Sequence, residues 1–393
     1  RSLQIQEQKD LQILLAYQGY KFNKKFKGFP NDPDIYAGLY NIAKKYGNKY
    51  YKVLSGHGGA VKSIALVPGK REFYTAGADG KVLRWNLENT TPAMRVIYSG
   101  SELIEVISLS PGADRLALGL DNSVIRVISL NGNKEPSFDL KGHAGKIQSL
   151  IFSYDGRYLY SAALDGRVLK WDLALKTSVD LETGNVQITS IDISSGGNYL
   201  AGVSSDGKAL VWNTELSTGV LRLENPGKSI KIIRFKPGEN IIAAGYSDGT
   251  LEMWNIEEKK KIHEIKAHEG EINQIRFNSV FSLLATASSD KTLKIWDLSD
   301  VKALPLTFSD NNGVVMAVEF SNDGSLIITG IDASENNIIV RPSTADLLAE
   351  DICQKLTRNF TEDEWYNYVG KDVGYEKTCS EKEFSIKVQQ IRQ

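Results

Sequence analysis

One motif recurs along most of the chain at a nearly constant interval, and this repeat limits the possible folds more than any other feature of the sequence. In the stretch "GHAGKIQSLIFSYDGRYLYSAALDGRVLKWDL", His143 is followed by Asp165 and then by Trp171. His57 and His268 begin two further copies, in which an aspartate and a tryptophan follow at the same offsets. Weaker copies have their turn aspartates at Asp121, Asp206, Asp248 and Asp332. Successive turn aspartates are roughly 41 to 44 residues apart, a period that predicts a repeat architecture.

Segments within each copy alternate between apolar and polar residues, as in "RVLKWDL" (167–173) and "TLKIWDL" (292–298). This period of two indicates half-buried β-strands. Short Asp-Gly, Pro-Gly or Asn-Asp-Gly sequences separate the strands. Each copy is therefore predicted to form a four-stranded antiparallel meander.

The dipeptides Gly-His, Asp-Gly and Trp-Asp recur at matched offsets, and over roughly residues 50–342 they resemble WD repeats. Seven copies of this kind imply an all-β fold, a seven-bladed WD-repeat β-propeller with short helical N- and C-terminal flanks. By the phase of the repeat, residues 50–54 ("YYKVL") are expected to form the outermost strand of the last blade. The other strands of that blade are expected from residues 314–341.

The resemblance also implies a structural tetrad in the three strongest copies. In each tetrad an aspartate orients a histidine, the histidine meets a hydroxyl group, and the hydroxyl group meets an indole N–H. The tetrads are His57, Thr75, Asp79 and Trp85; His143, Ser161, Asp165 and Trp171; and His268, Thr286, Asp290 and Trp296. Other copies have Ala117, Gly202 and Ala244 in place of the hydroxyl residue, so their blades are expected to depend more on apolar packing.

A catalytic interpretation of the same residue types is a hydrolytic triad of aspartate, histidine and serine. A catalytic triad occurs once, whereas this set occurs three times at one spacing, each time with a tryptophan. His263 is the only other histidine, so no cluster is left for zinc, and no phosphate-binding loop is intact. The sequence thus predicts no enzyme activity, no metal and no cofactor. An enzyme that uses the propeller channel is the remaining catalytic alternative.

The chain is expected to divide into three parts. Residues 1–48 are predicted to form a helical hairpin or a connector from an upstream domain, residues 49–343 the propeller, and residues 344–393 a helical extension packed on the propeller. The formal net charge is -1, which argues against nucleic acid as a partner. No apolar run is long enough for a membrane span.

Two helices are predicted after the propeller, one over residues 345–356 and a second that begins after Thr361. Glu364 follows this threonine by three residues, which is the spacing of a capping box. Cys353 and Cys379 are the only cysteines, and both lie in this region. Their spacing leaves open whether they pair; a disulfide would indicate an oxidising compartment.

The flanks contain "LLAYQGYKFNKK" before the repeats and "CQKLTRNFTEDEWYNYVG" after them. They resemble the flanks of WD-repeat regions in large bacterial multidomain proteins, including proteins with a STAND-type signalling NTPase. This resemblance implies a noncatalytic protein- or peptide-binding scaffold or sensor, the C-terminal part of a larger bacterial protein. The alternative is the ligand-sensing, autoinhibitory domain of such an NTPase. As a fragment the chain is expected to be monomeric, and its compartment, cytoplasm or periplasm, depends on upstream sequence.

The WD-repeat resemblance places the partner site on the narrower propeller face. There the residues directly before and after the leading apolar residue of each first strand face the channel mouth. The predicted contact residues are Lys62, Leu103, Glu105, Lys146, Gln148, Gln187, Lys231, Glu271, Val314 and Met316. Leu103, Val314 and Met316 are expected to form an apolar anchor, with Lys146 and Lys231 on the far side to attract an acidic group. The alternative is that these are ordinary loop positions.

Overall fold

The chain folds into two compact units. One unit consists of Val53–Ile339, and the other combines Arg1–Lys52 with Val340–Gln393. The computed structural model describes residues 2–88, 92–130, 136–181, 187–214, 219–223, 227–278, 280–350 and 352–379.

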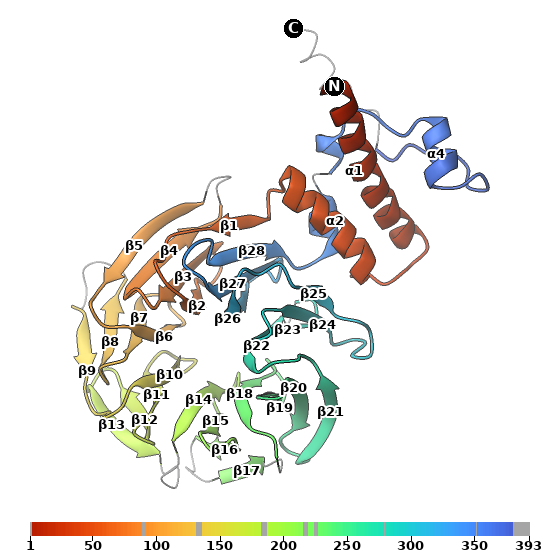
Figure 1. The fold of residues 1–393 in the computed structure, drawn as a ribbon. Helices are drawn as coiled ribbons and strands as arrows, with labels where there is room; N and C mark the ends of the chain where they lie inside the picture. The colour runs from red at the N-terminus through yellow and green to blue at the C-terminus, as the bar shows by residue number, and fades with distance from the viewer. Residues whose placement is uncertain are drawn as a thin grey trace. The chain divides into compact units, whose positions relative to one another are not determined.

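The larger unit is a ring of seven four-stranded antiparallel sheets (Figure 1). The first strands of the sheets contact one another in sequence around the ring, and the first strand of the seventh sheet contacts that of the first sheet. This closes a seven-bladed β-propeller, which confirms the predicted fold class.

Each blade has an inner, a second, a third and an outer strand. The inner strands are β2 (Val61–Leu66), β6 (Ile104–Leu109), β10 (Ile147–Phe152), β14 (Ile188–Ile193), β18 (Ile230–Phe235), β22 (Ile272–Asn278) and β26 (Val314–Phe320). The second strands are β3 (Glu72–Gly77), β7 (Arg115–Leu120), β11 (Tyr158–Ala163), β15 (Tyr199–Ser204), β19 (Ile241–Tyr246), β23 (Leu283–Ser288) and β27 (Leu326–Asp332). The third strands are β4 (Lys81–Asn86), β8 (Ile125–Ser129), β12 (Val168–Asp172), β16 (Ala209–Asn213), β20 (Thr250–Asn255), β24 (Leu293–Asp297) and β28 (Ile338–Pro342). The outer strands are β5 (Ala93–Ser99), β9 (Phe138–Leu140), β13 (Thr177–Leu181), β17 (Gly219–Leu223), β21 (Lys260–Lys266), β25 (Leu306–Phe308) and β1 (Lys52–Leu54).

Burial falls from the second strand of a blade to its outer strand. In the third blade, five of the six residues of β11 are buried, whereas four of the five residues of β13 are exposed. The second strand lies between its own blade partners and the faces of the neighbouring blades, so both of its faces are covered. The hydrophobic core therefore consists of layers between adjacent blades, and such a layer joins Ala117 and Ile125 of the second blade to Leu169 of the third.

Tight Asp-Gly turns join the second and third strands in four blades. Their glycines have φ angles from 72° to 83°, in the left-handed region that glycine enters at little cost: Gly80, Gly166, Gly207 and Gly249. In the third blade the carboxylate of Asp165 accepts a hydrogen bond from the backbone N–H of Arg167, which holds the turn closed. The turn thus fixes the position of the aspartate that the repeat pattern singles out.

The seventh blade is built from both ends of the repeat region. Its strand order is β1-β28-β27-β26, so the strand at Lys52–Leu54 is the outermost strand of a blade whose other strands come from the far end of the repeats. The phase that the sequence predicts for residues 50–54 is therefore confirmed. In this arrangement β1 covers an edge of β28 that would otherwise present unpaired backbone groups.

A truncation test measures what β1 contributes. A chain that starts at residue 55 is expected to aggregate at lower protein concentration and to melt at lower temperature than a chain that starts at residue 52. Both truncations remove the same N-terminal helices, so the difference between them isolates β1. Size-exclusion chromatography and thermal unfolding are the measurements, and identical behaviour of the two chains would contradict a latching role.

The second unit contains all the helices that the structure describes. They are α1 (Ser2–Lys25), α2 (Pro33–Tyr46), α3 (Ala345–Ala349), the 3-10 turn η1 (Cys353–Lys355) and α4 (Glu362–Tyr368). The carboxylate of Asp32 accepts hydrogen bonds from two N–H groups at the start of α2. Thr361 and Glu364 form a reciprocal capping box at the start of α4, as the sequence predicts. None of the described helices combines the length and apolar character that a membrane span needs.

The helix predicted over residues 345–356 is wrong in length. It ends at Ala349, and the next turn is the 3-10 segment η1. Tertiary contacts hold this stretch in its place: the carboxylate of Glu350 accepts a hydrogen bond from Tyr50, and Cys353 forms a disulfide with Cys379. A short helix has little stability of its own, so contacts of this kind decide where it ends.

Candidate functional site

Three blades contain a hydrogen-bonded chain of aspartate, histidine, hydroxyl and indole groups. In the third blade, His143 Nδ1 lies 2.9 Å from Asp165 Oδ2, and His143 Nε2 lies 2.7 Å from Ser161 Oγ. Trp171 Nε1 donates to the same hydroxyl oxygen at 2.8 Å. The first and sixth blades have the same contacts at 2.8 to 3.0 Å, from His57 and His268 respectively.

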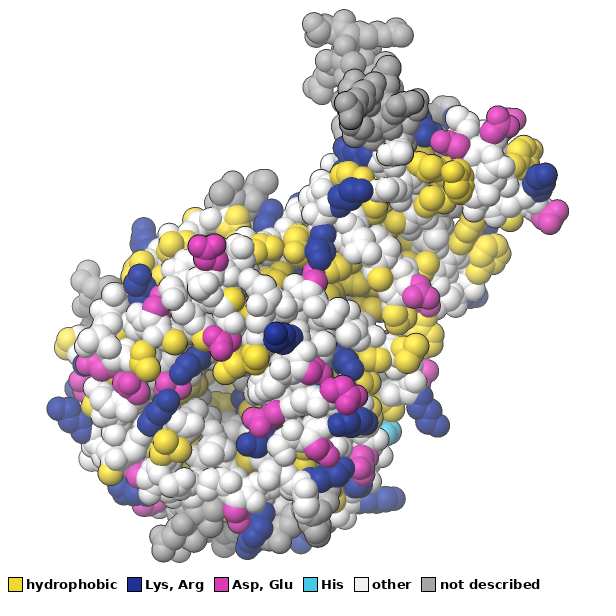
Figure 2. Space-filling view, viewed as in Figure 1, with side chains coloured by type: hydrophobic (Ala, Val, Ile, Leu, Met, Phe, Trp, Pro, Cys, Tyr) yellow, Lys and Arg dark blue, Asp and Glu magenta, His cyan; other side chains and the backbone are white. Residues whose placement is uncertain are grey.

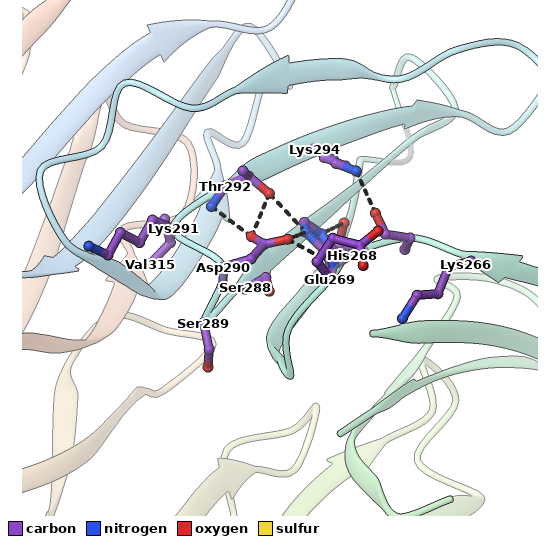
Figure 3. A network of polar contacts seen from close by, with 12 residues as sticks. Lys266, His268, Glu269, Ser288, Ser289, Asp290, Lys291, Thr292, Lys294 and Val315 are labelled. Carbon is purple, nitrogen blue, oxygen red and sulfur yellow. Dashed lines mark hydrogen bonds and ion pairs between the residues drawn. The ribbon is translucent and has the colours of Figure 1, made fainter. Parts of the chain in front are cut away.

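Burial lowers the pKa of these histidines, and hydrogen bonds lower the pKa of the aspartates against the effect of burial. Burial lowers the pKa of His268, and the nearby charge and hydrogen bond of Asp290 only partly oppose this effect. For Asp290, burial would raise the pKa, but hydrogen bonds from Thr292 and others outweigh it and lower the value to about 2. Figure 3 shows the Asp290 carboxylate between His268 and Thr292. Asp290 therefore accepts from Nδ1–H, and Nε2 accepts from the hydroxyl group of Thr286.

The hydroxyl groups of these chains are inaccessible. Thr75, Ser161 and Thr286 are all 0% exposed, and each hydroxyl already interacts with both an imidazole and an indole. A hydrolytic nucleophile must meet its substrate, so the geometry does not fit the hydrolytic triad. Among the described residues no three His, Cys, Asp or Glu side chains are grouped to hold a metal ion.

The fifth blade has a polar network of a different kind, which the sequence analysis missed. Glu252 is 0% exposed, and its carboxylate accepts hydrogen bonds from the hydroxyl of Tyr246 at 2.5 Å and from Trp254 Nε1 at 2.9 Å. Lys261 Nζ lies 3.2 Å from the same carboxylate. The expectation that a blade with Ala244 at the hydroxyl position depends more on apolar packing and less on a polar network is therefore wrong for this blade. A glutamate between Leu251 and Met253 in the third strand was the available signal.

The inner strands surround a central channel with a volume of about 630 Å³. In Figure 2 the propeller face in view is hollowed near its centre, with basic and acidic side chains around the hollow. The channel lining includes the residue directly after the leading apolar residue in all seven blades: Lys62, Glu105, Gln148, Thr189, Lys231, Asn273 and Met316. The predicted residues directly before the apolar residue are described but lie outside this lining: Leu103, Lys146, Gln187, Glu271 and Val314.

Of the two lysines predicted on the far side of the channel, Lys146 is placed differently by the structure, whereas Lys231, on β18, lies across the ring from the first blade. Lys146 Nζ lies 2.8 Å from Glu105 of the second blade, and Lys62 Nζ lies 2.7 Å from the same carboxylate. Lys146 therefore lies beside the second blade, because its inner strand β10 is the direct neighbour of β6. Lys231 pairs instead with Glu271 at 3.3 Å.

The predicted apolar anchor is only partly assembled. Leu103 is 38% exposed, whereas Val314 and Met316 are half-buried. The strand β2 contacts both β6 and β26, so one blade separates Leu103 from the other two residues. Of the three predicted anchor residues, Leu103 is thus the exposed one, and it lies on the same blade as Glu105.

A second layer of charged residues lies deeper in the channel, and the sequence analysis did not identify it. Asp192, Arg234, Arg276 and Glu319 occupy the same position on four successive inner strands, four residues after the leading apolar residue. In the other three blades this position holds Ala65, Ser108 and Ile151. Alignment of the seven repeats in register would have shown that charge is confined to one half of this layer.

Comparison with known proteins agrees with this geometry. The WD40 family model, described as "WD domain, G-beta repeat", matches residues 48–86, 134–172, 178–213 and 259–297. The chain carries WD40 repeats. The first, third, fourth and sixth copies, each with its tryptophan, are the ones matched, and together with the seven sheets they make the larger unit a WD40-repeat propeller.

Similar proteins come from eukaryotes. The chain is 32% identical to human WD repeat-containing protein 36 over 124 residues, which are 32% of this chain and 14% of that protein. It is 29% identical to guanine nucleotide-binding protein subunit beta-1 of Nicotiana tabacum over 137 residues, 33% of this chain and 36% of that protein. It is 28% identical to a U3 small nucleolar RNA-associated protein 21 homolog of Schizosaccharomyces pombe over 142 residues, 36% of this chain and 15% of that protein. These matches span about a third or less of each relative, and they give no support to the resemblance to bacterial STAND-type proteins.

Proposed function

We propose that this propeller is a noncatalytic platform that binds a protein or peptide at the mouth of its channel. The observation that carries the proposal is the rim cluster, which we define as Lys62, Glu105, Lys146 and Leu103. Two lysines contact one carboxylate in this cluster, so one positive charge is left uncompensated. An exposed leucine is two residues away from that carboxylate in the chain.

The rim cluster favours a partner segment with an apolar side chain next to an acidic one. Less than half of each charged side chain is exposed, since the values are 22% for Lys62, 33% for Lys146 and 12% for Glu105. Charges in such surroundings are screened less by salt than fully exposed charges. Because Glu105 already holds the lysines in place, an acidic partner would meet them without a large loss of side-chain entropy.

The names of similar proteins are compatible with a partner of this class. One relative is by name a subunit of a guanine nucleotide-binding protein, and others are by name associated with a small nucleolar RNA. By analogy, this chain would act within an assembly. We favour a protein partner over nucleic acid because the chain has a net charge of -1 and the rim lysines share a carboxylate.

A phage-displayed library of random peptides tests this proposal. Selection on the purified chain is expected to enrich peptides with an apolar residue beside Asp or Glu. Leu103→Asp and Lys146→Glu are each expected to weaken binding of a selected peptide by tenfold or more. Leu103→Asp should act mainly on the off-rate, because it removes an apolar contact, and Lys146→Glu on the on-rate and its salt dependence.

Matched substitutions elsewhere on the propeller provide the controls. Val179→Asp changes an exposed apolar residue on an outer strand, and Lys302→Glu changes an exposed lysine outside the channel. Both controls should bind the peptide as the unmodified chain does. Equal binding by the rim variants and the controls would contradict the proposal, as would displacement of the peptide by a single-stranded oligonucleotide at lower concentration than by the free peptide.

The finer hypothesis of a sensor module in a bacterial STAND-type protein is separate from the rim proposal. It rests only on the sequences of the two flanks. The sequence encoded upstream of Arg1 in the source genome tests it, because a switch NTPase domain there would support the hypothesis and any other domain would contradict it.

A further inference from the structure

The deeper channel layer brings two arginines close together with an unequal set of partners. Arg276 Nε lies 2.5 Å from Glu319 Oε2, so this guanidinium has a carboxylate counter-ion. Arg234, on the neighbouring strand β18, contacts Ser190 Oγ at 3.1 Å and the backbone carbonyl of Ile233 at 2.7 Å, both through Nη1. Among the described residues, no carboxylate lies within ion-pair distance of Arg234.

Asp192 lies in the same layer as Arg234, but the two side chains do not form an ion pair. Asp192 Oδ2 accepts a hydrogen bond from the backbone N–H of Phe235 at 2.7 Å. Burial raises the pKa of Asp192, against the opposing effects of Arg234 and other groups. The pKa of Arg234 is lowered to about 10, first by burial and then by the positive charge of Arg276. The layer thus holds two arginines and two carboxylates, but among the described residues only Arg276 and Glu319 form an ion pair within it.

Space and apolar surface lie beside these groups. The channel volume of about 630 Å³ is in the range of small-molecule sites. On the third blade the position equivalent to Arg234 is Ile151, and Ile107 and Ile191 also line the channel. A polar group held at Arg234 would therefore have an apolar wall within the same cavity.

The geometry points to a binding site for a small organic carboxylate in the channel, with the carboxylate held by Arg234 and Arg276 and the apolar body against the isoleucine side. A carboxylate is planar and matches the paired N–H donors of a guanidinium group, and Arg234 has Nε and Nη2 without an acceptor among the described residues. A dianion such as phosphate fits less well, because Glu319 and Asp192 lie in the same layer. This site does not rest on the function proposed for the rim.

Binding of matched acids and amides to the full chain tests the site. The probes are aryl- and alkyl-acetic acids of four to ten carbons, each compared with its primary amide by ligand-observed NMR titration up to 10 mM. At least one acid is expected to bind tenfold or more tightly than its amide, because only the acid can form the charged pair with Arg234. Inorganic phosphate is expected to bind at least tenfold more weakly than that acid.

Three substitutions at two arginines test whether the acid binds at Arg234. Arg234→Met is expected to weaken acid binding by tenfold or more, whereas Arg95→Met, which changes an exposed arginine on the outer strand β5, should leave it unchanged. Arg234→Lys keeps the charge but loses the paired donors, so its affinity for the acid is expected to lie between those of the unmodified chain and Arg234→Met. It replaces Arg234→Met as the test if the methionine variant does not fold. Leu103→Asp at the rim should not alter the Kd of the acid.

Each of several results would overturn this inference. They are the absence of binding by every acid up to 10 mM, equal binding of acids and amides, tighter binding of phosphate, and wild-type affinity in folded Arg234→Met or, if that variant is unfolded, in Arg234→Lys. A loss of acid binding in Leu103→Asp would move the site to the rim and would also contradict the assignment.

Discussion

Replacing His143 by alanine is expected to lower the free energy of unfolding by roughly 1–3 kcal/mol. The substitution leaves the Ser161 hydroxyl and the Asp165 carboxylate without the imidazole that each contacts at 2.7 to 2.9 Å. Ser161 is fully buried, so its hydroxyl has already lost bulk water and depends on the partners that the folded chain provides. Chemical denaturation measures the change. His57→Ala and His268→Ala are expected to have effects of the same size, because they break the same contacts.

The pH dependence of the same variant gives an independent check. Burial lowers the pKa of His143. The imidazole therefore takes up its second ring proton less readily in the folded state than in the unfolded state, where the pKa is about 6.5. The stability that this shift contributes is complete above pH 6.5 and is lost as the pH falls toward the folded pKa. The pKa of Asp165 is also lowered, because hydrogen bonds outweigh the effect of burial. Its contribution to the free energy of unfolding is likewise lost as the pH falls, but only below about pH 4. His143→Ala should therefore lose less stability than the unmodified chain between pH 7 and pH 5.

His263→Ala is the matched control, since this half-buried histidine lies on the outer strand β21 and belongs to none of the three hydrogen-bonded chains. It should change the free energy of unfolding by no more than about 0.5 kcal/mol, as is usual for substitutions away from such networks. An unchanged free energy of unfolding in His143→Ala, with loss of a measured activity, would contradict the structural role of this histidine.

Removal of the disulfide between Cys353 and Cys379 is expected to destabilise the helical unit by about 3 kcal/mol. The bond closes a loop of 26 residues, and the loss of chain entropy in the unfolded state sets this magnitude. The loop contains Trp365, which is fully buried and donates through Nε1 to the carbonyl of Val373. In the double variant Cys353→Ser and Cys379→Ser, the helical unit should unfold at a lower denaturant concentration than in the unmodified chain. The fluorescence change of Trp365 and the protease resistance of the helical unit are the measurements.

A reducing agent provides the control for the disulfide. It should destabilise the unmodified chain by a similar amount and leave the double serine variant unchanged. The larger unit, followed through the exchange of its backbone amides, should unfold at the same denaturant concentration in both proteins. Equal stability of the helical unit with and without the bond would contradict the prediction. Thiol labelling of protein from its native source would also report on the compartment, because structural disulfides persist in oxidising surroundings.

Much of the propeller follows from the sequence because its determinants are local. The histidine, hydroxyl, aspartate and tryptophan of one blade all lie within a single copy of the repeat, and antiparallel pairing with tight turns fixes their relative positions. Thr75 faces Leu83 in the register of β3 and β4, and Trp85 then reaches Thr75 from the same blade. The role of Lys52–Leu54 in the last blade follows from the same phase.

Contacts between blades and between distant segments do not follow from such patterns. Glu105 accepts from Lys62, 43 residues before it, and from Lys146, which lies in the next blade, so the cluster depends on how neighbouring sheets pack. The repeat indicates that these residues lie near the channel, but the direction and length of the side chains decide which of them meet. For this reason the sequence predicted Lys146 across the channel from Leu103, whereas the structure places it beside Glu105 of the second blade.

By itself, the sequence determined the latching strand and the capping box at Thr361, since the repeated period and a short motif specify them, while its resemblance to WD repeats implied the seven blades and the tetrad residues of three of them. Tertiary structure alone decided that Cys353 meets Cys379, with Cα atoms 5.8 Å apart, and that the preceding helix ends at Ala349. It also brought Arg234 and Arg276 together in the channel. These outcomes depend on the packing of segments that no local period relates, and packing free energy exceeds the small intrinsic preferences of short segments.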